Sequence, residues 1–222
     1  MNNQKVATIP LLKIEELATL FGDTFAEMQN FVQNNPHNCF DLLNHSVQCC
    51  LNCDIAPIRK DKQALIKIAC LYHDIGKLVT KAINPKTGYD CFYGHPLKGS
   101  MIAKDVFKKM EFNDDEIEYI LFMIANHDFF MNYKFADEIN NLQYDVIINE
   151  INVKKLIVRI QNQNAEAHLY VPSIIDFKEL CQVAIADAKS QAEMVYMHNK
   201  LVTTKANKIK HVETILDIIN TF

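Results

Sequence analysis

The sequence predicts an all-α protein built as one helical bundle. The 222 residues include only five glycines and six prolines, so the turn signals that sheets require are scarce. Hydrophobic residues make up 49% of the chain and charged residues 23%, which is the balance of a globular protein with a core. Apolar residues recur at helical spacing, and no repeat or linker divides the chain. We therefore expect a single domain over residues 1–222.

Two N-terminal helices are expected within residues 11–33. Leu11–Phe21 has apolar residues at helical spacing, and Gly22 can end that helix. Asp23 or Thr24 can cap a second helix that runs through Val32. These helices are expected to pack on a core of about residues 38–192.

The predicted core begins with two helices that carry histidines. The first runs from about Asn38 to Cys53 and has His45 in its middle. The second runs over Lys62–Asp74, is capped by Asp61, and is too apolar for a surface helix. It ends in the adjacent pair His73-Asp74, and Gly76 follows as a helix breaker. An imidazole and a carboxylate at the end of a buried helix are costly unless something binds them.

The middle of the chain is expected to form a loop and two further helices. Asn84–Gly94 contains two of the five glycines and predicts a loop or a small hairpin. His95 then opens a helix through Met110, with Pro96 at a favourable first position. Asn113 caps a helix over Asp114–Asn126, whose acidic first turn suits the helix dipole.

The last third is expected to be helical with one surface loop. Ala136–Val158 predicts helix with a break near Asn149–Asn152, and the polar stretch Gln161–His168 predicts a loop. Ser173 or Asp176 caps a helix through Ala192. Thr203 or Thr204 starts a C-terminal helix, about residues 204–222, that packs on the core.

Charge and cysteine content limit the possible partners and the location. The net charge is −4 and no run is rich in Lys or Arg, so an extended nucleic-acid surface is not expected. Neither a signal-peptide pattern nor a membrane-spanning apolar run is present, which predicts a cytoplasmic protein without a membrane partner. Seven cysteines without framework spacing predict free thiols; Cys49, Cys50 and Cys53 resemble only half of a zinc site.

A series of metal-type ligands runs through the predicted helices. A single histidine on an apolar helix is more often a core residue than a ligand, so the signal is the whole series. Imidazole nitrogens and carboxylate oxygens suit Mn, Fe, Co, Ni or Zn, and Mg where carboxylates and water dominate. A structural zinc takes about four ligands, whereas the larger set here suits two divalent metals in a bundle core. The candidate ligands are His45, His73, Asp74, His95, His127 and Asp187.

These residues lie in motifs that resemble a known family. Cys70–Lys77 (Cys-Leu-Tyr-His-Asp-Ile-Gly-Lys) is similar to the signature of the HD-domain metal-dependent phosphohydrolases. Phe92–Ser100, Ala125–Asp128 and Ala186-Asp187-Ala188 resemble its later motifs. The resemblance covers about Asn44 to Gln191. Its pattern is nearest to the HD domain of bacterial CCA-adding tRNA nucleotidyltransferases, here free-standing.

The resemblance implies roles for the ligands. His45, His73, Asp74 and Asp187 would hold a first metal, and Asp74 would bridge to a second metal held by His95 and His127. If only one metal binds, His95 and His127 would instead face the substrate phosphate as donors or as general acid.

Other residues are candidates for binding the substrate phosphate. Lys77 follows the metal pair and is expected to contact a phosphate and to take part in catalysis with Asp74, His95 and His127. The alternative is a solvated lysine just past a helix end. Lys98 and Ser100 lie in the first turns after His95, where a helix N-terminus favours anions.

The implied function is hydrolysis of a phosphomonoester or phosphodiester by water that the metal activates. The expected substrate is a nucleotide or an RNA end, such as a 2′,3′-cyclic phosphate. The Glu-Asp pair of alarmone hydrolases is replaced by Ile75–Val79, and the Gly-Tyr-Pro motif of cyclic-dinucleotide members is missing. A dinucleoside-polyphosphate hydrolase, a non-catalytic nucleotide-binding or regulatory module, and a partner subunit of a separate nucleotidyltransferase remain alternatives.

Overall fold

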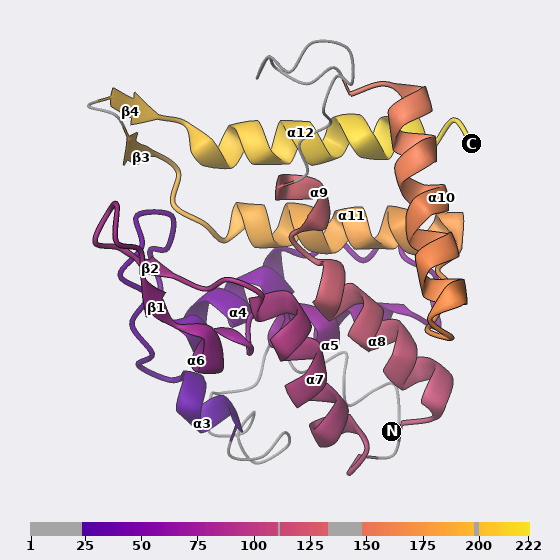
Figure 1. Cartoon of the computed structure of the whole chain (residues 1–222), viewed down its shortest axis with the longest axis horizontal. Coiled ribbons are helices and arrows are strands. Elements are labelled where there is room, and N and C mark those ends of the chain that lie inside the picture. The colour runs from indigo at the N-terminus through magenta and orange to yellow at the C-terminus, as the bar shows by residue number, and fades with distance from the viewer. Residues whose placement is uncertain (1–23, 111, 133–147, 198–199) are drawn as a thin grey trace.

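The computed structural model describes residues 24–110, 112–132, 148–197 and 200–222 (Figure 1). The predicted all-α class is confirmed: within the described ranges, helices dominate and strands form only two short antiparallel pairs. The helix predicted over Leu11–Phe21 lies outside the described residues. No helix in the described ranges combines the length and apolar character needed to cross a bilayer.

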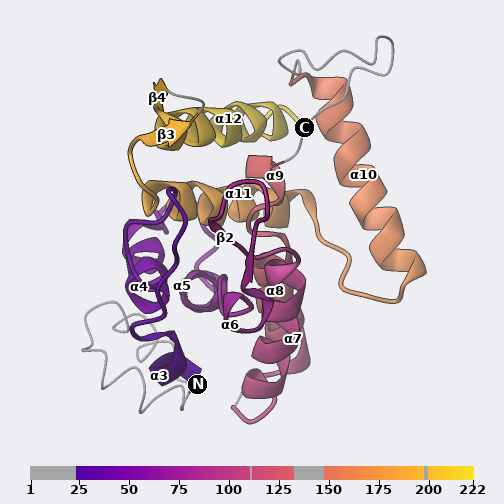
Figure 2. The same cartoon turned by 60° about the vertical axis from the view of Figure 1, so that its left-hand side comes forward.

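The helix α5 (Gln63–Tyr72) forms the centre of the bundle. Figure 2 shows α4 (Leu42–Asn52) and α8 (Asp114–Asn126) on opposite sides of α5, and α11 (Ile174–Lys189) also packs on it. Seven of the ten residues of α5 are buried, from Leu65 to Tyr72. The run that is too apolar for a surface helix is therefore the core of the protein. Because α5 is enclosed by other helices, its C-terminal end lies inside the bundle.

The remaining helices cover this centre. The helix α7 (His95–Phe107) packs along α8, and α12 (Thr204–Ile219) runs antiparallel to α11 (Figure 1). The helix α10 (Glu150–Glu166) stands at the edge of the bundle and contacts α12 (Figure 2). Three short helices, α3 (Thr24–Met28), α6 (Lys77–Thr80) and α9 (Phe129–Asn132), complete the described helical part.

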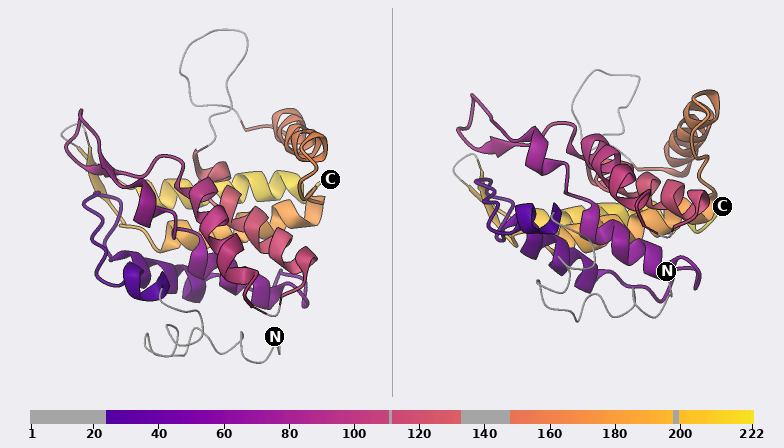
Figure 3. Two further views of the ribbon diagram at one scale, coloured as in Figure 1. Left: turned by 60° about the horizontal axis from the view of Figure 1, so that its bottom comes forward. Right: turned by 90° about the horizontal axis from the view of Figure 1, so that it is seen from below.

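Two strand pairs lie at one end of the bundle (Figures 1 and 3). The strands β1 (Ala82–Ile83) and β2 (Asp90–Cys91) are antiparallel, which confirms the small hairpin predicted near Asn84–Gly94. The strands β3 (Val195–Met197) and β4 (Lys200–Val202) connect α11 to α12. This second pair was not predicted from the sequence.

Side-chain caps set several helix starts as predicted. Asn113 and Ser173 each form a capping box with the acidic residue three positions later, Glu116 and Asp176. Asp61, however, does not cap α5: the N-cap position is Lys62, and no side chain bonds the free amides there. The helix predicted from Asn38 starts at Leu42 instead, with Asp41 as its cap.

Other boundaries differ from the predictions. The second N-terminal helix ends at Met28 instead of Val32, just before Asn30, whose φ of 62° is left-handed. The stretch Gln161–His168 was wrongly predicted as a loop, since α10 continues to Glu166. Most of these polar side chains are exposed on the outer turns of α10, so their polarity reflects a solvated helix end.

Candidate metal centre

The six candidate ligands converge at one place in the bundle. They come from α4, from the C-terminal end of α5, from the start of α7, from the end of α8 and from α11. His95 is half-buried and the others are buried. The ligands are far apart in sequence, so only the packing of these helices around α5 brings them together. The set is His45, His73, Asp74, His95, His127 and Asp187.

Asp74 lies between two pairs of histidines. Its Oδ2 atom is 3.2 Å from Nε2 of His45 and 3.3 Å from Nε2 of His73. Its Oδ1 atom is 3.0 Å from Nε2 of His95 and 3.6 Å from Nε2 of His127. Each oxygen of this one carboxylate therefore faces a different pair of imidazoles.

The first histidine pair is completed by a second carboxylate. Oδ1 of Asp187 lies 3.1 Å from Nε2 of His45 and 3.7 Å from Nε2 of His73. The two imidazole Nε2 atoms are themselves 3.3 Å apart. Ligand atoms of His45, His73 and Asp187 all lie within 4.8 Å of one another, close enough to share one cation.

The second histidine pair also has a neighbouring carboxylate. Nε2 of His95 lies 3.3 Å from Nε2 of His127. A carboxylate oxygen of Asp128 lies within 4.8 Å of ligand atoms of both histidines. Asp128 can therefore either join this half of the site or orient what binds there.

All four histidines present the same nitrogen to the centre. The opposite atom, Nδ1, donates to a backbone carbonyl in each case, at 2.7–3.2 Å. For His73, His95 and His127 the acceptor is the carbonyl three residues earlier, so the local backbone, helical or turn, orients each ring. A hydrogen bond at Nδ1 leaves the Nε2 lone pair free for a metal.

This donor set fits divalent first-row metals. Four Nε2 atoms and the oxygens of two buried carboxylates crowd into one space, where lone pairs repel unless positive charge separates them. Mixed imidazole and carboxylate ligation suits Mn, Fe, Co, Ni and Zn. The residues present could hold two such ions, with Asp74 shared between them.

The pKa values show how the protein balances this charge itself. Burial would raise the pKa of Asp74, but Lys77 and His73 outweigh it and hold the pKa well below its usual range. Burial would likewise lower the pKa of His73, but Asp74 and Asp187 raise it to about 10. For His127, burial and the positive charge of His73 lower the pKa to about 4. A proton on His73 and the charge of Lys77 thus offset part of the negative charge.

Lys77 lies inside the site and is not a solvated lysine at a helix end. Its Nζ atom is 2.7 Å from Oδ2 of Asp74 and donates to Oε1 of Gln33 at 2.8 Å. The ammonium also lies over the ring of Phe92, 5.3 Å from its centroid. The side chain is buried, so its charge serves first to neutralise Asp74.

A cleft of about 340 Å³ opens beside the histidines. One wall is the loop of residues 35–38 and another is residues 91–96. A hydrogen bond joins these two walls: Asn34 N donates to Oδ2 of Asp90 at 2.8 Å. A second bond connects the loop of residues 35–38 to the segment after α11, since Ala192 N donates to the carbonyl of His37 at 2.8 Å. Lys77, His95 and Asp128 line the cleft, so the metal site meets the cleft at His95 and Asp128.

Two predicted phosphate-binding residues are not brought to this cleft. Lys98 is exposed and does not line it. The hydroxyl of Ser100 is buried and donates to the carbonyl of Leu97 at 2.9 Å, so it is committed to its own helix. The first turn of α7 brings His95 to the site, and both residues lie away from the cleft.

Two residues reach the site without having been predicted. Gln191 Nε2 donates to Oδ1 of Asp187 at 3.1 Å, and Nζ of Lys208 donates to Oε1 of Gln191 at 2.6 Å. Gln191 follows Asp187 by four residues, and that helical spacing is a signal the sequence does contain. Lys208 belongs to α12, and nothing in its local sequence links it to the site.

Comparison with known families gives one match. The family model described as HD domain matches residues 42–190, more than half of the chain. The match starts at the first residue of α4 and ends just after α11, so it includes the six ligands and leaves out α12. No curated protein matches the chain.

Proposed function

The chain belongs to the HD-domain family, whose members are in general metal-dependent phosphohydrolases, and we propose that it hydrolyses a phosphoester of a nucleotide or of an RNA end. The reaction would take place where the cleft meets the histidine–aspartate cluster. The proposal covers phosphomonoesters and phosphodiesters, including a 2′,3′-cyclic phosphate.

The observation that carries the proposal is the position of Asp74 between two histidine pairs. A carboxylate that faces two sets of imidazoles is suited to bridge two cations, and two-metal sites are common among enzymes that cleave phosphoesters. Divalent cations bound here would lower the pKa of water and neutralise the charge of a phosphoryl group.

The side chains divide into two groups in this proposal. His45, His73, Asp74 and Asp187 are deeply buried and would hold the first cation. Asp74, His95 and His127 would hold the second, with Asp128 close by. If one cation binds, the half-buried His95 at the cleft wall is the ligand best placed to donate a proton to the substrate instead.

The walls of the cleft support a nucleotide as substrate. Tyr93 lines the cleft with most of its side chain exposed, and Asn38 adds an amide group on another wall. An exposed aromatic ring can stack on a base, and amides can bond to its edge. The resemblance to the HD domain of CCA-adding enzymes supports the choice of nucleotides and RNA ends as the first substrates to test.

The test combines metal analysis with a substrate panel. The panel contains nucleoside 2′-, 3′- and 5′-monophosphates, 2′,3′-cyclic nucleotides, a dinucleoside polyphosphate and short RNAs with phosphorylated ends. We expect wild-type protein to contain bound divalent metal and to cleave at least one class. Asp74→Asn should lower that activity by more than the roughly 10–100-fold typical of residues that only support a ligand, and it should lower metal content.

Asp61→Asn is the matched control, since Asp61 is largely exposed and away from the cluster. It should leave metal content and turnover unchanged. The opposite outcome is that metal-replete wild-type protein cleaves no member of the panel and shows the same absence of turnover as Asp74→Asn. That result would favour a nucleotide-binding module without catalysis.

A further inference from the structure

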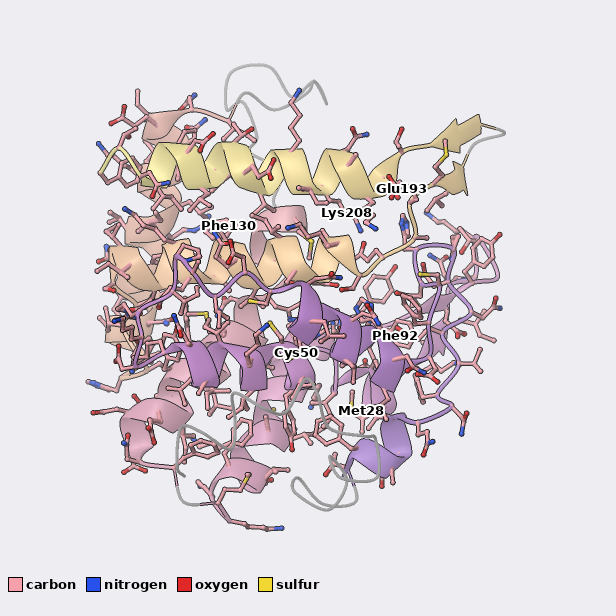
Figure 4. All side chains as sticks on the ribbon, turned by 180° about the vertical axis from the view of Figure 1, so that it is seen from behind. Met28, Cys50, Phe92, Phe130, Glu193 and Lys208 are labelled. Carbon is pink, nitrogen blue, oxygen red and sulfur yellow. The ribbon has the colours of Figure 1, made fainter. Side chains whose placement is uncertain are left out.

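Lys208 is a cation at the cleft without a carboxylate partner at ion-pair distance in the described parts of the chain. It lies on the side of α12 that faces α11, and it lines the cleft (Figure 4). Its Nζ atom donates to the neutral amide of Gln191 at 2.6 Å. A half-buried ammonium bonded to an amide keeps most of its charge uncompensated.

The charged groups around Lys208 act on it from a distance. Asp187 and Asp128 attract its charge from beyond ion-pair distance, while Lys77 repels it. Burial lowers the pKa of Lys208, and the two carboxylates do not offset that effect. His37, on the wall made by residues 35–38, has its own pKa lowered by burial and by Lys208. Within the described parts of the chain, Lys208 is thus a cation whose hydrogen-bond partner is a neutral amide and whose neighbouring carboxylates lie beyond ion-pair distance.

Lys77 and Lys208 differ in what they can offer a substrate. Lys77 already pairs with Asp74 at 2.7 Å and is buried against Phe92. Lys208 faces the cleft from another element and has only an amide to exchange for an anion. Of the two lysines that line the cleft, Lys208 is therefore the better placed to bind a phosphate oxygen.

We propose that Lys208 binds the terminal phosphate of the substrate and gives the site a preference for phosphomonoesters over phosphodiesters. This inference rests on the proposed phosphohydrolase function. A terminal phosphate has three charged acceptor oxygens and a charge of about −1.5 to −2 at neutral pH. A diester has only two such oxygens and a single charge. If the two cations hold both oxygens, none is left for Lys208.

Gln191 connects Lys208 to the metal site through two hydrogen bonds. Gln191 bonds Asp187 with its amide nitrogen and Lys208 with its amide oxygen. When Lys208 turns to a phosphate, Gln191 keeps its bond to Asp187. Because α12 lies outside residues 42–190, this contact is supplied by a part of the chain that the family match does not include.

The test measures anion binding by titration calorimetry on metal-loaded full-length protein. The probes are inorganic phosphate, which like a phosphomonoester has at least three oxygens free of ester bonds, and dimethyl phosphate, a diester with only two. Lys208→Gln should weaken inorganic phosphate binding about tenfold, as expected for loss of one charged hydrogen bond, and should leave dimethyl phosphate and metal content unchanged. Where a phosphomonoester is turned over, its KM should rise by a similar factor with kcat nearly constant.

Two variants separate phosphate binding from support of the metal site. Lys210→Gln removes an exposed charge from the same helix and should change neither probe. Gln191→Leu should weaken metal binding through Asp187 and leave phosphate binding at saturating metal intact.

The proposal is overturned if Lys208→Gln lowers metal affinity but leaves phosphate affinity at saturating metal unchanged, or if it weakens both probes equally. Both measurements are made without turnover. Failure of the Lys208 contact is therefore distinguished from failure of the proposed hydrolysis, which only the substrate panel reports.

Discussion

Nζ of Lys77 lies 2.7 Å from Oδ2 of Asp74, the same oxygen that faces His45 and His73. The two residues are one helical turn apart and both are buried. The positive charge of the lysine therefore neutralises Asp74 in part, as a metal ion bound at this oxygen would. That relationship links the stability of the protein to its metal content.

We expect Lys77→Met to lower the free energy of unfolding of metal-free protein by up to about 3–5 kcal/mol, since it removes one of the two cations, Lys77 and His73, that offset the buried Asp74 carboxylate. With saturating divalent metal the loss should be smaller, because the metal supplies the missing charge. Urea unfolding with chelator and with metal gives both values. Lys154→Met is the control: both side chains of its ion pair with Glu150 are exposed, so the loss should stay below about 1 kcal/mol. Equal losses with and without metal would contradict the charge argument.

The stability of metal-free protein should fall as the pH rises from about 6.5 to 10. The pKa of His73 is raised from 6.5 to about 10 in the folded protein. A raised pKa contributes stability that is complete below 6.5 and is lost as the pH rises through the folded value. Urea unfolding with chelator at a series of pH values measures this slope. His73→Gln should flatten it, and the exposed His168→Gln should not.

Metal binding near pH 8 should release a proton from His73. At that pH the metal-free residue is protonated, since its pKa is about 10, and it must lose the proton to ligate. Calorimetry in buffers of different ionisation enthalpy should report about one proton released from His73. The same titration of His73→Gln should show that release removed. A binding heat that does not depend on the buffer would show that His73 is neutral or is not a ligand.

Gly76→Ala should disrupt the junction between α5 and α7. A Cβ at Gly76 would lie 2.0 Å from the carbonyl oxygen of His95 and 2.5 Å from the amide nitrogen of Gly99. Both contacts are backbone, so α7 must shift and carry His95 with it. We expect the free energy of unfolding to fall by at least the roughly 1–3 kcal/mol typical of overpacking, and metal binding to weaken.

Gly88→Ala separates this effect from backbone strain. Gly88 has a φ of +72° and open space around it, so alanine there should cost only about 1–2 kcal/mol and leave metal binding unchanged. Urea unfolding and metal titration test both variants. A Gly76→Ala protein with wild-type metal affinity would show that α7 does not depend on this close approach.

Arg59→Met should destabilise the protein at a place remote from the cleft. Arg59 Nε and Nη2 bond Glu179 at 2.9 and 2.6 Å, and Nη2 also bonds Asp176. Both carboxylates are buried, so removing the cation should cost about 3–5 kcal/mol. Lys154→Met, which breaks an exposed pair with Glu150, should cost less than about 1 kcal/mol. Urea unfolding compares the two, and similar losses would show that burial does not govern this pair.

Much of the fold followed from local patterns. The apolar run before His73 predicted a buried helix, and the caps at Asn113 and Ser173 predicted helix starts that the structure has. Predictions failed where polarity was taken for a loop, as at Gln161–His168, because a helix with one solvated end has the same composition. Gly76 was read as a helix breaker, yet its φ of −63° is helical and its small size serves the approach of α7.

The candidate site was predictable to the extent that its residues lie in helical motifs. The six proposed ligands were chosen from residue type and context, and the structure brings all six together. Lys98 and Ser100 were chosen because they follow a helix start. Neither is available at the cleft, because the direction of a side chain around a helix is set by packing.

By itself, the sequence determined the helical class and the residues able to hold a metal, because helical periodicity and ligand chemistry are local properties. Tertiary structure alone decided that Asp74 faces two histidine pairs and that Lys208 reaches the cleft from α12. Those relationships depend on how distant helices pack around α5, and no short stretch of sequence contains that information.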